Sequence, residues 1–210
     1  MNGSEHYADS AAAFALRPIF GANVTSTGSR TESRQRIYYA NHTSHLDFIV
    51  LWAALPSSHR RMTRPVAAKD YWSNGWIRGA VAERLFRAVL IDRPEAYPES
   101  LGGQTMLDPL LKAVDEGSSL ILFPEGTRGT GERIGTFKSG IYHLCRLRPG
   151  LQLLPVYLEN LNRILPKGEF MPVPLLSRVV FGSPVELREA EPKDEFLERA
   201  RAALAGLWSA

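Results

Sequence analysis

Six short apolar runs alternate with segments of helical periodicity, and this alternation constrains the fold of the chain more than any other feature. The runs are rich in β-branched, aromatic and leucine residues and predict strands at 36–40, 64–69, 88–91, 119–123, 151–159 and 178–182. The other segments predict helices near 45–54, 73–86, 104–116 and 138–147, and an amphipathic helix across 192–208. Strands that are buried on both faces and separated by helices form parallel sheets. The expected fold class is therefore α/β, with a mixed, mostly parallel sheet flanked by helices in a single domain.

The length of 210 residues suits one domain, which we expect to span residues 36–210. Residues 1–35 are interpreted as an N-terminal lead-in. Within this lead-in, residues 10–20 have enough apolar character for a short amphipathic helix. Residues 22–35 are polar and carry short side chains, which is typical of a linker or a mobile segment.

Composition narrows the class of protein. The longest apolar run, residues 48–56, is far shorter than the roughly 20 residues that span a bilayer. The single cysteine, Cys145, excludes an intrachain disulfide, and the N-terminus lacks the basic start of a secretory signal. We therefore expect a cytoplasmic protein. The net charge of +3 weakly favours anionic partners, such as phosphorylated small molecules or an anionic membrane surface.

The stretch NHTSHLD, residues 41–47, places a histidine and an aspartate just after the first predicted strand. On an ideal helix, residues five apart lie about 140° apart around the axis, so two mid-helix side chains at this spacing would not meet. His42 and Asp47 can meet if Ser44 is the helix N-cap, because Asp47 then lies in the first turn and His42 in the preceding loop. A histidine held by a carboxylate is a general base with a fixed tautomer.

Two other interpretations of this stretch stay open. Ser44 and Asp47 could form only a capping box, in which Asp47 accepts hydrogen bonds from main-chain donors and His42 is a polar turn residue. His42, His45 and Asp47 are also conceivable metal ligands. The remaining histidines and Cys145 show no ligand-like spacing, so we expect no metal.

A glycine-rich loop follows the predicted strand that ends at Phe123, and its charged residues include Glu125, Arg128, Arg133 and Lys138. Such a loop lets main-chain amides and cationic side chains approach an anion closely. Gly126 and Gly131 have the glycine spacing of a Walker loop, but Glu132 and Arg133 stand where lysine and serine or threonine are required. A nucleoside triphosphate site is therefore not expected, and an ordinary polar surface loop is the alternative.

Two further cations, Lys69 and Arg93, lie at or just after the ends of predicted strands, where ligands of α/β sheets bind. A solvated strand end is the alternative for each. No serine lies in a Gly-x-Ser-x-Gly elbow, and His143 and Cys145 would lie about 200° apart on a helix. The sequence therefore offers no serine or cysteine nucleophile for a covalent acyl-enzyme.

Together these motifs resemble those of the glycerolipid acyltransferases, typified by bacterial lysophosphatidic acid acyltransferase. The matching segments are 41–47 for the H-x4-D motif NHxSxxD, 64–69 for a strand ending in lysine, 91–93 for I/L-D-R, 123–128 for FPEGTR, 137–140 for F-K-x-G and 151–159 for a strand with a V/L-P-V core. The resemblance covers about residues 36–187.

The resemblance implies an O-acyltransferase that moves a fatty acyl group from acyl-CoA or acyl carrier protein to lysophosphatidic acid, giving phosphatidic acid. His42 would take the proton of the acceptor hydroxyl, and Asp47 would hold His42 in the right tautomer. Neither a cofactor nor a covalent intermediate is implied. The residues implied to bind the phosphate and glycerol of the acceptor are Lys69, Arg93, Glu125, Gly126, Thr127, Arg128 and Lys138.

Several alternatives remain for the function. The acceptor could be another lysophospholipid, glycerol 3-phosphate or a non-lipid alcohol. A non-catalytic lipid-binding module and a metal-dependent hydrolase are the competing classes. A binding module needs no general base, so the intact His42, Asp47 and Glu125 favour an enzyme.

The amphiphilic substrate predicts peripheral contact with the inner face of the membrane. Residues 57–65 concentrate Arg60, Arg61 and Arg64, and residues 70–87 combine tryptophans with arginines, as suits a water–lipid interface. Core tryptophans with a solvated arginine face, or an acidic carrier protein, would account for the same residues. No nucleic-acid partner is expected.

Overall fold

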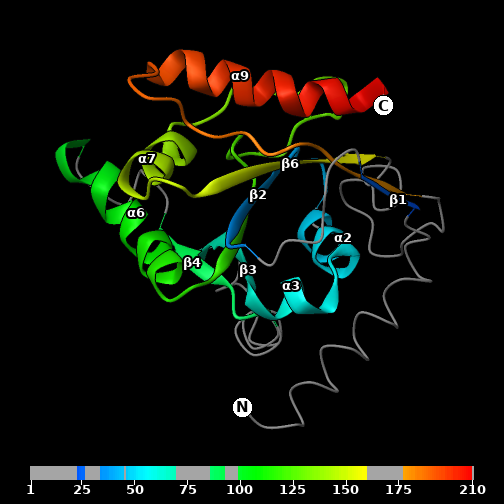
Figure 1. Cartoon of the computed structure of the whole chain (residues 1–210), viewed down its shortest axis with the longest axis horizontal. Coiled ribbons are helices and arrows are strands. Elements are labelled where there is room, and N and C mark those ends of the chain that lie inside the picture. The colour runs from blue at the N-terminus through cyan, green and yellow to red at the C-terminus, as the bar shows by residue number, and fades with distance from the viewer. Residues whose placement is uncertain are drawn as a thin grey trace, which may run out of the picture.

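A computed structural model describes residues 23–26, 34–44, 46–69, 86–92, 99–159 and 177–209, without the side chains of residues 99–106 and 209. Within these residues, seven strands form one sheet in the order β1-β7-β6-β2-β5-β3-β4 (Figure 1). The strands are β1 (Asn23–Ser26), β2 (Arg36–Ala40), β3 (Thr63–Ala68), β4 (Val89–Ile91), β5 (Ser119–Leu122), β6 (Gln152–Glu159) and β7 (Arg178–Phe181). Neighbouring strands are parallel except β6 and β7. The expected mixed, mostly parallel α/β fold is confirmed.

Helices cover both faces of this sheet. The described helices are α2 (Asp47–Ala54), α3 (Ser57–Met62), α6 (Glu99–Asp115), α7 (Gly140–Leu147), α9 (Lys193–Ala205) and the 3-10 helix η2 (Gly206–Ser209). Helices α6, α7 and α9 pack on one face, and α2 and α3 lie on the other (Figure 1). The sequence did not predict α3, because its six residues, SSHRRM, contain no periodic apolar face.

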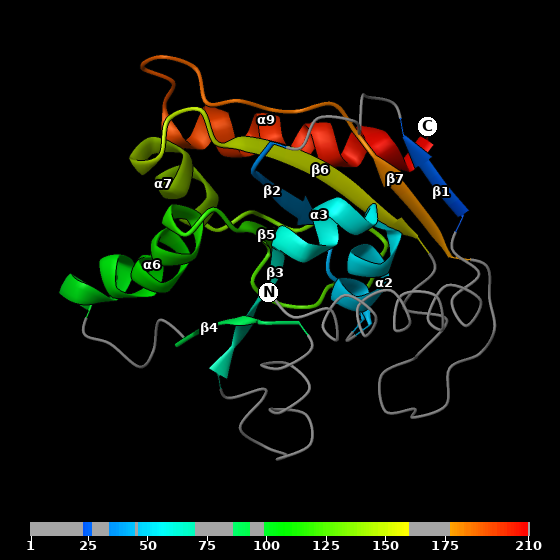
Figure 2. The same cartoon turned by 60° about the horizontal axis from the view of Figure 1, so that its bottom comes forward.

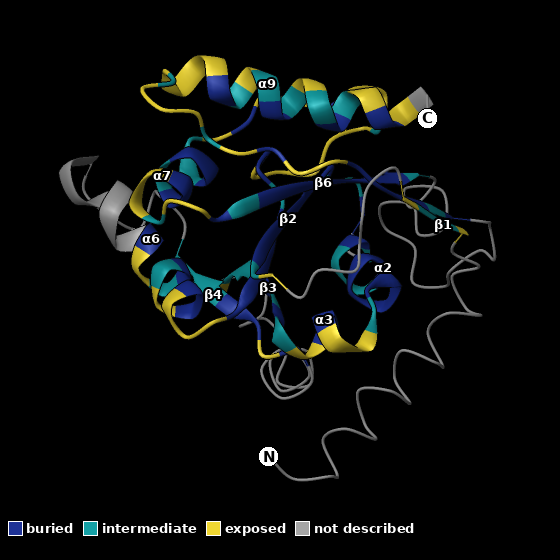
Figure 3. Ribbon diagram, in the orientation of Figure 1, coloured by how far each residue is buried: buried dark blue, intermediate teal, exposed yellow. Residues whose placement is uncertain are grey.

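The central strand β2 divides the core into two layers. All of its residues are buried (Figure 3). Ile37 and Tyr39 pack in the cluster that includes α6, α7 and α9, whereas Tyr38 and Ala40 pack in the cluster that includes α2. Because side chains alternate along a strand, a strand buried on both faces has no solvent-facing positions, which explains the apolar run that follows the buried Arg36.

Strand β1 corrects the linker expected across residues 22–35. Asn23–Ser26 pairs in parallel with β7, with Val24 opposite Val179 (Figure 2). The main-chain N–H of Asn23 also donates to the Ser177 carbonyl at 2.9 Å. The sequence of this edge strand, NVTS, is short and mostly polar, so it carries no strand pattern of its own. Its main-chain hydrogen bonds come from β7, and the linker prediction is wrong at these four residues.

Arg60 corrects part of the expected membrane-facing stretch. This side chain is 7% exposed. Its guanidinium donates to the Leu55 carbonyl at 2.7 Å and lies 5.5 Å from the centre of the Trp52 ring. Arg60 therefore satisfies a carbonyl at the end of α2 and packs on that helix, which keeps its charge away from a lipid surface. Arg61 on the same helix is exposed.

Two expected segments cannot be compared with the structure. The short amphipathic helix at 10–20 and nearly all of the helix at 73–86 lie outside the described residues. Among the helices that the structure does describe, none combines the length and the apolar character that a membrane crossing requires.

Candidate active site

The loops after β2, β5 and β3 leave the sheet at the same end, because these three strands are adjacent and parallel. The loop after β2 begins with Asn41 and His42, the loop after β5 contains the FPEGTR segment, and Lys69 directly follows β3. In α/β sheets, ligands bind at the carboxyl ends of the strands. The strand order therefore brings the sequence motifs together at the carboxyl end of the strands, where a ligand is expected.

His42 and Asp47 form a hydrogen-bonded pair. The Nδ1 atom of His42 lies 2.8 Å from Oδ2 of Asp47, whose side chain is fully buried, whereas the His42 side chain is 24% exposed. An ionised carboxylate only accepts hydrogen bonds, so Nδ1 donates and Nε2 keeps a lone pair. The pair can therefore act as a general base whose tautomer is held by the carboxylate.

Asp47 also organises the turn between β2 and α2. Its Oδ2 atom accepts hydrogen bonds from the main-chain N–H groups of Thr43 at 2.6 Å and Ser44 at 2.9 Å. Helix α2 begins at Asp47 itself, with Leu46 at the N-cap position and no side-chain capping bond, so the expected Ser44 N-cap is wrong. Asp47 thus satisfies main-chain donors, as the capping alternative required, and holds His42 through the same oxygen.

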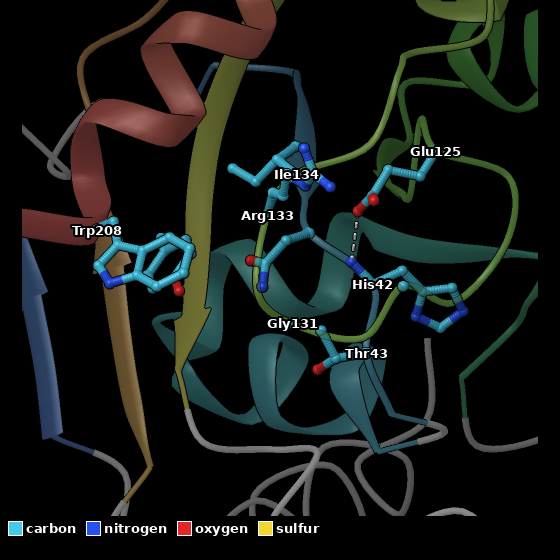
Figure 4. A pocket seen from close by; sticks show the side chains of 10 residues that line it. His42, Thr43, Glu125, Gly131, Arg133, Ile134 and Trp208 are labelled. Atoms are coloured by element: carbon cyan, nitrogen blue, oxygen red, sulfur yellow. Dashed lines mark hydrogen bonds between the residues drawn. The ribbon is translucent and has the colours of Figure 1, made fainter.

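The rest of His42 contacts the segment that follows β5. Its ring stacks on Phe123, with the ring centres 4.3 Å apart and the planes inclined by 20°. Its main-chain N–H donates to Oε1 of Glu125 at 2.9 Å, and its carbonyl accepts from the Gly129 N–H at 2.8 Å. Figure 4 shows the Glu125 carboxylate directed at the main chain of His42, away from its imidazole. The second oxygen of Glu125 accepts from the Gly135 N–H at 2.8 Å.

The cations expected to bind phosphate have different surroundings. The ammonium of Lys69 lies 2.6 Å from a carboxylate oxygen of Asp92, at the carboxyl ends of β3 and β4. The Lys138 side chain packs over Gly126, where an added Cβ would lie 3.4 Å from its Cγ. Gly126 has a φ of +72°, which favours glycine at this turn. Thr127 and Arg128 are exposed in the same loop, and Arg93 lies outside the described residues.

A small pocket lies behind the His42 main chain (Figure 4). Arg133, Tyr157 and Trp208 line it, together with parts of the loops after β2 and β5. The rings of Tyr157 and Trp208 stack with their centres 5.8 Å apart. No sequence pattern connects these residues, because Trp208 reaches the site through the packing of α9 and η2 on β6.

Two competing chemistries find no support at this site. Among the residues that the structure describes, no three or more histidine, cysteine, aspartate or glutamate side chains form a group that could hold a metal; His45 is not among those residues. Cys145 is buried in the core, and this burial raises the pKa of its thiol to about 12. A thiol with such a pKa is a poor nucleophile near neutral pH.

The chain is similar in sequence to several known proteins. The chain is 28% identical over 160 residues to a 1-acyl-sn-glycerol-3-phosphate acyltransferase of Limnanthes douglasii, a match that covers 75% of this chain and 53% of the relative. It is 27% identical over 149 residues to a protein named taffazin of Dictyostelium discoideum, covering 67% of this chain and 50% of that protein. The chain thus spans about half the length of these curated relatives.

The chain is also similar in fold to a solved structure. The crystal structure of the 1-acyl-sn-glycerophosphate acyltransferase PlsC from Thermotoga maritima matches with a TM-score of 0.72 at 18% identity, covering 98% of this chain and 78% of PlsC. At this identity the match supports the fold alone. The family model described as Acyltransferase matches residues 22–159, which is well over half of the chain. This protein therefore belongs to the acyltransferase family.

Proposed function

We propose that this protein is an O-acyltransferase that moves a fatty acyl group from acyl-CoA or acyl carrier protein to the hydroxyl of lysophosphatidic acid, giving phosphatidic acid. The observation that carries this proposal is the 2.8 Å contact between His42 Nδ1 and the buried Asp47 carboxylate at the carboxyl edge of the sheet. The names of the relatives support the same acceptor, since several are 1-acyl-sn-glycerol-3-phosphate acyltransferases.

The proposed reaction needs one base and no covalent enzyme intermediate. Nε2 of His42 takes the proton of the acceptor hydroxyl as its oxygen attacks the thioester carbonyl carbon. The negatively charged Asp47 stabilises the imidazolium that forms. When the tetrahedral intermediate collapses, the carbon–sulfur bond breaks and the imidazolium gives its proton to the departing thiolate. The products are the new ester and a free thiol, and His42 returns to its neutral form.

The cations of the site are proposed to bind the phosphate of the acceptor. Lys69, Arg93, Arg128 and Lys138 would supply the charge, and the exposed turn at Gly126 and Thr127 would let main-chain amides approach it. Arginine side chains suit this role because the guanidinium can form two parallel hydrogen bonds to one phosphate.

An acyl-transfer assay with one acyl-CoA and a panel of acceptors tests the proposed function directly, because each turnover releases one thiol. The panel contains lysophosphatidic acid, a second lysophospholipid, glycerol 3-phosphate and a non-lipid alcohol. We expect the highest kcat/KM with lysophosphatidic acid. A higher kcat/KM with another acceptor would reassign the substrate, and absence of thiol release with every acceptor and with an acyl carrier protein donor would refute acyl transfer.

Replacing Arg128 with alanine is expected to raise the apparent KM for the phosphorylated acceptor by about 10- to 100-fold, with a smaller effect on acyl-CoA. The reason is that a charge-assisted hydrogen bond contributes about 1.5–3 kcal/mol. Steady-state kinetics with each substrate varied in turn measure both constants. Arg146→Ala is a matched control, because Arg146 is exposed on α7. If Arg128→Ala weakened only the donor, the guanidinium would belong to the phosphates of CoA.

Peripheral contact with an anionic membrane is a further part of the proposal. We expect the protein to co-sediment with vesicles that contain anionic lipid, and to do so less as salt rises, because surface charges are screened over about 10 Å at 0.1 M salt. Trp76→Ala, in the tryptophan-rich segment that lies outside the described residues, is expected to reduce binding without unfolding the protein. Recovery of all the wild-type protein in the supernatant at low salt would contradict membrane contact and favour a carrier-protein donor.

A further inference from the structure

We propose that Glu125 is a positioning residue that holds the main chain of His42, rather than a ligand of the acceptor's glycerol. This inference rests on the proposed general-base function of His42. We call the Glu125 carboxylate and its two main-chain partners, the N–H groups of His42 and Gly135, the carboxylate clamp. The clamp assigns Glu125 a role that differs from the one implied by the family resemblance.

Both oxygens of Glu125 are engaged by the protein itself. Oε1 accepts from the His42 N–H at 2.9 Å, and Oε2 accepts from the Gly135 N–H at 2.8 Å. The residue is 8% exposed, so water has little access to compete for these bonds. A buried carboxylate is stable only when hydrogen bonds replace its hydration. The two main-chain amides provide that replacement, so that both oxygens of Glu125 are occupied by the protein although the residue lines the pocket beside His42.

The clamp joins two loops that are far apart in the sequence. Glu125 and His42 are 83 residues apart, and the same segment after β5 also supplies the Gly129 N–H to the His42 carbonyl and the Phe123 ring to its imidazole. His42 is thus held at its amide, its carbonyl and its ring by one segment, while Asp47 holds Nδ1. The position of Nε2, the atom that takes the proton, depends on all of these contacts.

The glycine at position 135 allows the clamp to close. A Cβ atom added to Gly135 would lie 2.9 Å from Oε2 of Glu125, closer than real Cβ contacts allow. At Gly129 an added Cβ would lie 3.5 Å from the same oxygen, which is ordinary contact. Any side chain at position 135 must therefore move the carboxylate or the loop, and because both oxygens of Glu125 are already bonded, the clamp predicts that this shift reaches the main chain of His42.

The clamp also explains why a carboxylate stands at position 125. The His42 and Gly135 N–H groups reach different oxygens of Glu125, and an amide side chain puts an oxygen at only one of those two positions. Glu125→Gln therefore preserves shape but turns an N–H donor toward either His42 or Gly135. A general base displaced by about 1 Å from its productive position loses up to about 100-fold in rate. The substitution should therefore lower kcat and leave the acceptor KM nearly unchanged, because the substrate contacts themselves are unchanged.

Three variants separate the clamp from a substrate ligand. We expect Glu125→Gln and Gly135→Ala each to lower kcat by about 10- to 100-fold while the acceptor KM changes less than about 3-fold. The double variant is expected to resemble the more impaired single variant, because both changes act through one contact. Gly206→Ala is the matched control, since an added Cβ there meets nothing within 4 Å. A raised acceptor KM with an unchanged kcat in Glu125→Gln, or a Gly135→Ala variant indistinguishable from the control, would overturn the proposal.

Residue-resolved amide hydrogen exchange tests the clamp without any substrate. In the wild type, the N–H groups of His42 and Gly135 are expected to exchange slowly, and Glu125→Gln is expected to accelerate at least one of them. Exchange of both at the rate of an exposed loop in the wild type would refute the clamp. Slow exchange in a wild type that transfers no acyl group would instead contradict the proposed function, and it would leave the hydrogen bonds of the clamp supported. The two failures are therefore distinguishable.

Discussion

Replacing His42 with alanine is expected to lower the rate of acyl transfer by about 10²- to 10⁴-fold, the usual contribution of a positioned general base. The imidazole is the only group of this residue that the reaction needs, because the N–H and carbonyl that contact Glu125 and Gly129 remain in the variant. The fold should therefore persist while the proton acceptor is lost. Thiol release at saturating substrates measures the effect, and circular dichroism checks the fold.

A second histidine provides the control for this prediction. His143 is half-buried on α7 and stacks edge-on against Tyr142, outside the group of residues around His42. His143→Ala is expected to keep most of the wild-type turnover. A folded His42→Ala variant that kept more than about a tenth of the wild-type turnover would rule out His42 as the general base.

Replacing Asp47 separates its two roles. In Asp47→Asn the amide oxygen can still accept from the Thr43 and Ser44 N–H groups, and the amide nitrogen can take the place of Oδ1, which has no hydrogen-bond partner among the described residues. The negative charge beside the imidazolium is lost, so we expect kcat to fall by about 100-fold with little change in stability. The variant should keep a small residual activity, because the His42 base is still present.

Asp47→Ala should add a loss of stability to this loss of activity. It leaves three donors without their acceptor: the N–H of Ser44, which is buried, and the N–H of Thr43 and Nδ1 of His42, which are partly buried. An unsatisfied buried donor costs about 1–3 kcal/mol, and the partly buried donors cost less because water can reach them, so the free energy of unfolding should fall by at least about 1 kcal/mol. Urea unfolding of both variants measures this difference. If both lost stability and kept full activity, Asp47 would serve only the turn.

The strands were predictable because the sheet is buried on both faces. Strands β2, β5 and β6 lie in the middle of the sheet, so the residues inside each strand are apolar or aromatic whichever face they point to, and charged or small polar residues stand only at the strand ends. Strand β1 was not predictable, because an edge strand needs no apolar pattern when β7 supplies its main-chain partners. The burial of Arg60 on helix α3 was also not predictable. Its guanidinium packs on Trp52 and donates to the Leu55 carbonyl, but in the sequence it cannot be distinguished from a surface charge.

In the candidate site, contacts between residues close in sequence were predictable, and contacts between distant segments were not. The pairing of His42 with Asp47 could be predicted from a stretch of six residues, because a turn before a helix limits where two residues five apart can lie. The partners of Glu125 could not, since they depend on the adjacency of β2 and β5, which brings residues 83 apart into contact. The stacking of Trp208 on Tyr157 likewise depends on how α9 and η2 cross β6. Short-range geometry follows from backbone sterics and spacing, whereas contacts between distant segments depend on strand order and helix packing, which no local pattern encodes.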